Sequence, residues 1–158
     1  MKISTRARYG TRAMLDLALH QGEGPVMVKD IAERQQISSR YLEQLLFNLK
    51  LAGLVRSTRG NRGGFTLAKK PSQIKILDIV ETLDGSIAPV GCVDEPDLYV
   101  RSQFCAAHDI WCQVKKAASK VLQSITLEEL AQQQQGKEAL AKKIGKPAIK
   151  AMYAKCRE

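Results

Sequence analysis

Residues 28–55 read VKDIAERQQISSRYLEQLLFNLKLAGLV, and the fold class can be argued from these residues. Its apolar residues recur at helical spacing in two runs, which predicts a short helix over 29–35 and a longer one over 39–51. The turn between them is tight, so the two apolar faces can share one small core. This pattern is typical of a helix-turn-helix. One turn residue is unusual, because Gln36 stands where such turns prefer a glycine in the left-handed conformation.

The second helix of a helix-turn-helix lies in the DNA major groove, with its first side chains at base edges. Ser38 or Ser39 is expected to cap this helix, since a serine hydroxyl accepts a free backbone N–H there. The side chains free to meet DNA are those of Ser39, Arg40, Glu43 and Gln44. The alternative is an amphipathic helical hairpin with no role on DNA.

The segment that follows predicts a wing. It reads GLVRSTRGNRGGFTLAKK from Gly53, with short strands expected over 55–58 and 65–67. The loop between them carries Arg59 and Arg62, and arginine suits a narrow minor groove or a phosphate. A nucleotide-binding glycine loop is excluded, because no Lys-Ser/Thr pair follows and no helix begins there.

Two further helices are expected around this motif. One covers about 5–20, where Gly10 should weaken the helix by about 1 kcal/mol relative to alanine. Another has its apolar face on residues 76–83 and ends at Gly85. Three arginines of the first helix lie off its apolar stripe, and either phosphates or water would suit them: Arg6, Arg8 and Arg12.

Length and charge narrow the class of protein. The chain has 158 residues, the size of one domain or of one small domain with an appended helix, and a net charge of +9. Residues 1–70 hold 13 Lys/Arg against 5 Asp/Glu, whereas residues 71–158 hold 12 against 11. A basic half joined to a nearly neutral half favours a polyanion as partner of the first. No apolar run is long enough for a membrane span, and no signal peptide is evident, so we expect a cytoplasmic protein.

A cysteine-rich stretch follows at residues 92–112. If a helix begins near Cys105, then Cys105, His108 and Cys112 share one face at positions i, i+3 and i+7. Cys92 lies upstream of a loop long enough to fold back as a fourth ligand. Three thiolates and an imidazole suit an iron–sulfur cluster or zinc rather than hard cations. The alternative is a group of buried or free cysteines near a helix start.

The helix expected over about 108–124 carries an apolar face in addition to the face with the cysteines and the histidine. Its members repeat at spacings of 3, 4, 3 and 4, as in a coiled coil: Trp111, Val114, Ala118, Val121 and Ile125. One long apolar helix on so small a domain predicts a symmetric dimer. Thr126 and Glu129 form a capping box for a last short helix.

The chain is thus expected to be mainly α and to divide into four parts. Residues 1–85 are the winged helix-turn-helix domain, and 86–107 are a cluster-binding loop. Residues 108–130 are the dimerisation helix and its cap. The remainder, 131–158, is expected to be a mobile tail in which Cys156 is a bystander thiol, because glycines and a proline interrupt it.

Four segments resemble the iron–sulfur cluster regulator (IscR-like) family over about residues 1–130: MKISTRARYGTRAMLDLAL, IAERQQISSRYLEQLL, STRGNRGGF and DGSIAPVGC. The resemblance implies a homodimeric winged-helix transcription factor with a [2Fe–2S] cluster, in preference to a [4Fe–4S] cluster. Three cysteines and a histidine are the ligands in the family's cluster-assembly regulators. Other members sense nitric oxide or iron, and one represses cysteine metabolism without a cluster.

Residue by residue, Cys92 matches the family's first cysteine, while Cys105 and His108 match its last cysteine and its histidine. The middle cysteine is absent, because Leu98 and Tyr99 occupy that region. Cys112 is an additional thiol, which we interpret as the replacement ligand. On the DNA side, the resemblance assigns base-reading positions to Glu43 and Gln44 and a wing contact to Arg59.

The implied function is a regulator that senses cluster status or redox state, acts on a palindromic operator in double-stranded DNA and controls cluster-assembly genes. Two alternatives stay open: a cluster-free thiol or zinc switch on the same residues, and a repressor controlled by a partner enzyme. No nucleophile–base pair or acid pair is evident, so we do not expect an enzyme.

Overall fold

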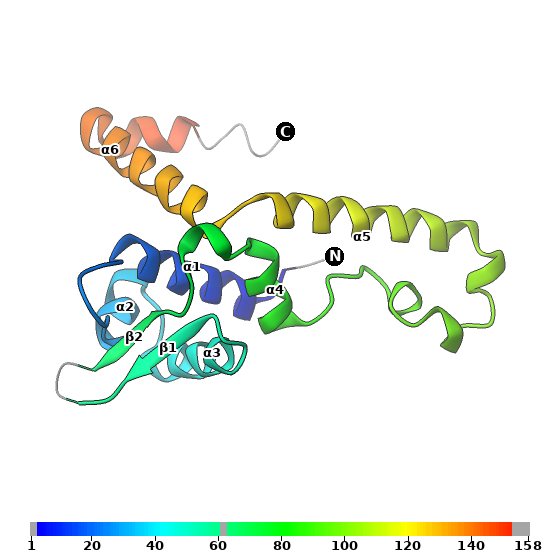
Figure 1. Cartoon of the computed structure of the whole chain (residues 1–158). Coiled ribbons are helices and arrows are strands. Elements are labelled where there is room, and N and C mark those ends of the chain that lie inside the picture. Colours follow the sequence, from blue (N-terminus) through cyan, green and yellow to red (C-terminus); the bar gives the residue numbers. More distant parts are fainter. Residues whose placement is uncertain (1–2, 61–62, 153–158) are drawn as a thin grey trace.

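The computed structural model describes the backbone of residues 3–60 and 63–152 (Figure 1). It describes side chains as far as residue 143. Six α-helices and one two-stranded sheet occur in these ranges: α1 (Thr5–Leu19), α2 (Val28–Gln35), α3 (Ser39–Leu51), β1 (Val55–Thr58), β2 (Gly64–Leu67), α4 (Ile76–Asp84), α5 (Ala106–Ser124) and α6 (Leu127–Met152). The strands pair antiparallel, with Val55 opposite Leu67. The predicted fold, a mainly α winged helix-turn-helix, is confirmed.

The core of the domain lies where α1, α3 and α4 meet. Met14, Leu49 and Ile79 are fully buried there. Gly10 of α1 explains how closely α1 and α4 approach, because a Cβ at this position would lie 2.0 Å from Leu83 Cδ1. The glycine that weakens the helix in isolation therefore permits its packing.

The turn between α2 and α3 has the geometry that the sequence predicted at Gln36. This residue adopts φ 52° and ψ 50°, the left-handed conformation. Ser38 occupies the N-cap position of α3, but its side chain makes no capping hydrogen bond, so the prediction of a hydroxyl cap is wrong. Its backbone carbonyl still accepts from Leu42 N at 2.9 Å. At the start of α1, by contrast, Ser4 Oγ accepts from Ala7 N at 3.2 Å.

Helix α5 extends away from this body, and the chain between 85 and 105 runs beside it (Figure 1). After α5 the chain returns to the body, where Ile76 N donates to Ile125 O at 3.1 Å and Leu127 N donates to Ile74 O at 2.9 Å. Leu127 is fully buried. The end of the segment expected to be a dimerisation cap is thus part of the core of the winged-helix domain.

For the C-terminal part, the prediction of a short helix followed by a tail was wrong, because residues 127–152 form one long helix. Thr126 and Glu129 do form the expected capping box, with Glu129 N donating to Thr126 Oγ1 at 3.1 Å and Thr126 N donating to Glu129 Oε2 at 2.7 Å. The helix that they start is not short, however, since α6 runs to Met152. Its Gln, Lys, Glu, Ala and Leu residues favour a helix, and an interior glycine such as Gly136 weakens one by only about 1 kcal/mol. Cys156 lies outside the described residues.

Among the residues described, no helix is long and apolar enough to cross a lipid bilayer.

Candidate DNA-binding surface and soft-donor site

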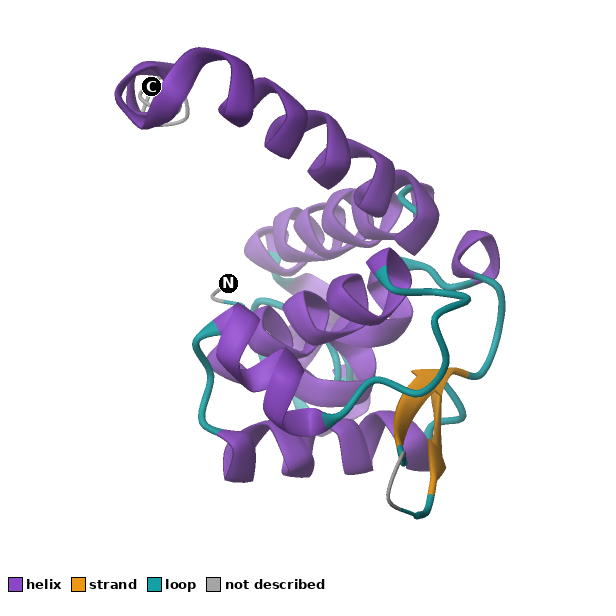
Figure 2. Ribbon diagram, turned by 90° about the vertical axis from the view of Figure 1, so that its left-hand side faces the viewer, coloured by secondary structure: helices purple, strands orange, loops and turns teal. Residues whose placement is uncertain are grey.

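The outer face of α3 is the main candidate surface. Arg40, Glu43 and Gln44 are exposed there and line a shallow depression together with Phe47 and Asn48. The leucines of the same helix are buried on its other side. Helix α3 lies along one edge of the molecule with the two-stranded wing next to one end, so both present themselves to the same side (Figure 2). Ser39 is exposed at the start of the helix.

The wing adds positive charge to this side. Arg59 is exposed beside Gly60, whose φ of 115° turns the chain at the tip of the hairpin. Arg62 lies outside the described residues. Gly64 passes so close to the backbone of Val26 that a Cβ would lie 2.3 Å from Val26 O, and Phe65 N donates to that oxygen at 2.8 Å. The wing is thus held to the chain that precedes α2.

A basic cleft between the end of α3 and the wing was missed from the sequence. It is lined by Lys50, Arg56 and Lys69, and Lys50 Nζ donates to Ser57 Oγ at 2.6 Å. The strand alternation was the available signal, because Val55 is buried and Arg56 must then point outward. These cations suit DNA phosphates.

The arginines of α1 have partners within the protein. Arg12 donates from Nε to Gln35 Oε1 at 3.2 Å and from Nη2 to the Gln35 carbonyl, and its guanidinium lies 5.6 Å from the Tyr9 ring centre. Arg8 is 5.8 Å from the same ring centre. Arg6 Nε lies 3.9 Å from Asp84 Oδ1.

A buried carboxylate fixes α2 against α1. Asp16 is only 1% exposed and accepts from Arg34 Nη2 at 2.6 Å, Arg34 Nε at 3.0 Å and Gln35 Nε2 at 3.0 Å. The hydrogen bond to Asp16 raises the pKa of Arg34, as expected for a guanidinium beside an anion. The same carboxylate lies 3.6 Å from His20 Nδ1. Helix α2, and therefore the turn into α3, is oriented by this group.

Two of the four expected metal ligands, His108 and Cys112, are in contact. Cys112 Sγ lies 3.4 Å from His108 Nε2, one helical turn apart on α5. The other ring nitrogen, His108 Nδ1, is buried and has no hydrogen-bond partner. Cys105 is the N-cap residue of α5, with φ −105° and ψ 104°, and is exposed. The face expected to begin at Cys105 therefore begins at His108.

Cys92 lies in a short 3-10 turn, Gly91–Val93, that packs against α5. Its thiol is partly exposed and forms no disulfide, and the same holds for Cys112. Over the described ranges, no set of three His, Cys, Asp or Glu side chains is close enough to hold a metal ion. The donor types match the expected site, and the structure brings two of the four donors together.

The Cys92 turn is tied to α5 by Asp94. Its Oδ1 accepts from Lys115 Nζ at 2.5 Å and from Ser86 Oγ at 2.8 Å. The hydrogen bond from Lys115, followed by that from Ser86, lowers the pKa of Asp94 below its usual 3.8. A cation on α5 thus holds the loop that carries Cys92.

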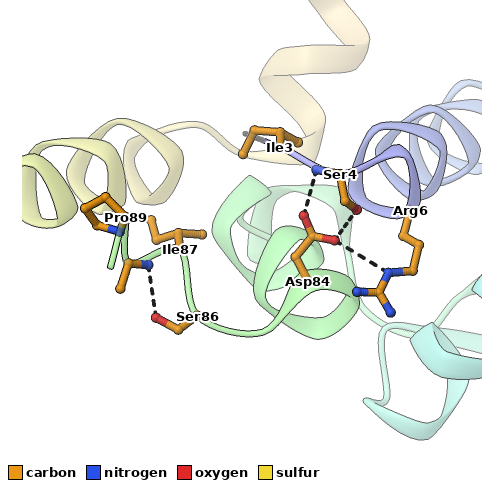
Figure 3. Close-up of a pocket in the computed structure, with 8 residues that line it drawn as sticks. Ile3, Ser4, Arg6, Asp84, Ser86, Ile87 and Pro89 are labelled. Atoms are coloured by element: carbon orange, nitrogen blue, oxygen red, sulfur yellow. Dashed lines mark hydrogen bonds and ion pairs between the residues drawn. The ribbon is translucent and has the colours of Figure 1, made fainter. Parts of the chain in front are cut away.

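The root of this loop is held to the start of α1. Asp84, the last residue of α4, accepts from Ser4 N at 3.0 Å and from the Ser4 hydroxyl (Figure 3). Figure 3 shows Arg6 reaching the same carboxylate from the first turn of α1. The point where the cysteine loop leaves α4 is therefore fixed relative to the DNA-binding helices.

A helix-turn-helix, a basic wing and exposed polar side chains on α3 define a winged-helix DNA-binding transcriptional regulator. The chain belongs to the Rrf2 family, described as iron-dependent transcriptional regulators, whose family model matches residues 3–133. The described function of the family is regulation of transcription, so the chain is not an enzyme.

Named relatives fall in more than one branch of this family. Protein rrf2 of Nitratidesulfovibrio vulgaris is 45% identical over 130 residues, covering 82% of this chain and 87% of that protein. The solved structure of CymR, the global cysteine regulator of B. subtilis, is 41% identical, with a TM-score of 0.73, covering 84% of this chain and 97% of that one. IscR of T. potens is 44% identical, with a TM-score of 0.70, covering 84% and 88%.

Proposed function

We propose that this protein is a dimeric regulator whose DNA binding depends on an iron–sulfur cluster held by Cys92, Cys105, His108 and Cys112. The observation that carries the proposal is the contact between His108 Nε2 and Cys112 Sγ, beside a buried imidazole nitrogen with no partner. A thiol and an imidazole one turn apart on a helix are a natural pair of ligands for a soft metal centre.

The donor set fits the group chemically, since thiolates and imidazoles both serve as ligands of iron–sulfur clusters. When bound, the cluster would supply a redox-sensitive link between the loop and α5. The chain's own residues prepare that link: Asp94 and Lys115 hold the Cys92 turn against α5, and Ser4 and Asp84 hold the root of the loop against α1. A change in the loop can thereby bias the DNA-binding helices.

A [2Fe–2S] cluster is our first choice of cofactor, and cluster-assembly genes with a palindromic operator are our first choice of target. The likeness to IscR of T. potens supports an iron–sulfur cofactor. The choices of a [2Fe–2S] cluster and of the target genes rest on the resemblance of the four sequence segments to IscR-like regulators. The cytoplasm is the corresponding compartment, because thiols stay reduced there.

The test is anaerobic purification followed by iron and sulfide analysis and by visible and electron spin resonance spectra. We expect a coloured protein whose iron is lost in Cys92→Ala, Cys105→Ala and Cys112→Ala and kept in Cys156→Ala. His108→Ala should retain more iron than the cysteine variants and shift the spectrum, since imidazole is one ligand among thiolates. Full iron in Cys112→Ala would remove that residue from the ligand set.

A second candidate, a cluster-free zinc or thiol switch, is favoured by a specific observation. Among the four proposed ligands, only His108 and Cys112 are in contact. Leu98 and Tyr99 occupy the region where the family's middle cysteine is expected. The likeness to CymR of B. subtilis is compatible with this alternative. Colourless protein with stoichiometric zinc would establish a zinc switch. Protein free of metal, with DNA binding that depends on oxidation, would establish a thiol switch.

On DNA, we propose that α3 enters the major groove and that the wing contacts the minor groove or phosphates. In this arrangement Gln44 would pair with adenine and Glu43 would accept from cytosine N4. Gln44→Ala should relax the preference at one base pair per half-site by about 1–3 kcal/mol. Arg59→Ala should weaken all sequences alike and reduce the salt slope by about one unit if it contacts one phosphate. Titrations of each variant with matched and mismatched duplexes at several salt concentrations measure both effects. An equal, uniform loss of affinity in the two variants would contradict this placement of α3.

A further inference from the structure

Phe47 is an aromatic residue that the packing of α3 does not explain. Its side chain is 57% exposed, although its neighbours Leu46 and Leu49 are completely buried. It is absent from the buried core and from the partly buried residues packed against that core. A large exposed apolar side chain in the middle of a candidate DNA-reading face calls for a functional reason.

The position of Phe47 gives that reason. It follows Glu43 by four residues and Gln44 by three, so it lies one turn further along the same face. With Arg40, Glu43, Gln44 and Asn48 it lines one shallow depression on the outside of α3. Phe47 lies eight positions after Ser39, a rise of about 12 Å, which is comparable to the width of the major groove. The ring therefore lies within the part of the helix that a groove can enclose.

We infer that Phe47 is a specificity-determining residue that recognises thymine through its 5-methyl group. A phenyl ring forms no conventional hydrogen bond with a base edge, and the thymine methyl is the apolar group that the major groove offers. Enclosing this methyl against the ring removes apolar surface of both partners from water. The inference rests on the proposed placement of α3 in the major groove, and it adds an apolar contact with a base to the hydrogen bonds that the polar residues of this face can make.

The same helix contains a matched control. Leu51 is 72% exposed and lies four residues after Phe47, on the same side of α3. It is one turn further from the helix N-terminus, where the residues that contact bases lie. Phe47 and Leu51 are thus two exposed apolar side chains on one face, and only the first is placed to meet a base.

The experiment begins with selection of preferred sites from random duplexes by the full-length wild-type protein. Each thymine of the selected site is then replaced singly by uracil, which removes the methyl group and leaves the hydrogen-bonding edge unchanged. We expect wild-type affinity to fall roughly fourfold at one position per half-site, as for one buried methylene of about 0.8 kcal/mol. Phe47→Ala should bind thymine and uracil equally at that position, whereas Leu51→Ala should keep the wild-type difference.

Two results would overturn the inference. One is a wild-type protein that shows no loss of affinity for uracil at any position. The other is a Phe47→Ala variant whose loss of affinity for uracil equals that of the wild type at each position. Gln44→Ala separates this failure from that of the proposed function. If Gln44→Ala relaxes base preference while Phe47→Ala retains the uracil penalty, only the role of Phe47 is wrong. If neither variant alters base preference, the placement of α3 is wrong and the inference falls with it. Circular dichroism on each variant checks that the fold is kept, which is expected because both apolar side chains are exposed.

Discussion

At the scale of single residues, the orientation of the helix-turn-helix depends on one charge that the sequence did not single out. Asp16 occurs among the apolar residues of α1 and is 1% exposed, whereas the side chain of Arg34 is 38% exposed. A buried carboxylate needs its partners more than a half-exposed guanidinium does, because only the former is cut off from water. Pattern analysis along one helix could not find this pair, since its members are 18 residues apart on different helices.

The pair should therefore respond unequally to removal of each member. Arg34→Met leaves the Asp16 carboxylate buried with only its weaker partners, and we expect it to lower the free energy of unfolding by about 3–5 kcal/mol. Asp16→Asn leaves a guanidinium that water can reach, and we expect about 1–3 kcal/mol. Urea denaturation of both single variants and of the double variant measures the asymmetry. A larger loss for Asp16→Asn than for Arg34→Met would contradict this explanation.

At the scale of secondary-structure elements, the sequence predicted well wherever a periodic apolar face is buried by its neighbours. Helix α3 and strand β1 begin and end as expected, because core leucines and strand alternation specify them. Prediction failed for α6, where we treated Gly136, Gly145 and Pro147 as helix breakers. The start of α5 falls where it was expected, at Ala106, but Cys105 is the N-cap residue and so is not on the helical face that it was expected to share. Side-chain spacing alone does not show whether a glycine ends a helix or where the first helical turn is.

Two glycines within helices should show opposite effects of substitution by alanine. Gly136→Ala meets no atom within 4 Å and should stabilise the protein by up to about 1 kcal/mol through helix propensity. Gly10→Ala gains the same propensity but places a Cβ 2.0 Å from Leu83 Cδ1, and overpacking costs about 1–3 kcal/mol. We expect a net loss of roughly 1 kcal/mol for Gly10→Ala. Thermal unfolding of the two variants is the measurement, and a rise in Tm for Gly10→Ala would show that α1 and α4 separate more easily than the packing indicates.

The tie between the Cys92 turn and α5 should be visible as a pH effect. Because the pKa of Asp94 is lowered in the folded state, its contribution to stability is present above about pH 4. It is lost as the pH falls through the lowered value. Lys115→Met removes the largest cause of the lowering, so the pKa of Asp94 should rise back toward 3.8, with a smaller rise in Ser86→Ala. Carboxyl carbon NMR titration measures both, and an unchanged Asp94 in Lys115→Met would show that the ion pair is not formed in solution.

At the scale of the whole molecule, α5 exposes an apolar face that the rest of the chain leaves uncovered. None of its 19 residues is buried, and Trp111 and Val121 are 40% and 58% exposed. Only its far end, with Ala118 and Leu122, packs against the core of this chain, together with the C-cap residue Ile125. A second copy packed along the same helix would bury the rest and would place two DNA-binding domains on one duplex, as a palindromic operator requires. We therefore expect a homodimer formed through α5.

A charge at the centre of this apolar face should separate the protomers. Val121→Asp would bury an unpaired carboxylate in the contact, which is far more costly than leaving it in water, so we expect a monomer at micromolar concentration. Gln123→Asp is the matched control, because two residues turn a helix by about 200° and place the same charge on the opposite side. Sedimentation velocity should show a dimer for the wild type and for Gln123→Asp. Since the α5 face contributes little to the core of one chain, Val121→Asp should retain its helical circular dichroism while losing affinity for a two-half-site duplex. A monomeric wild type at these concentrations, or a dimer of Val121→Asp as tight as the wild type, would show that α5 is not the dimer contact.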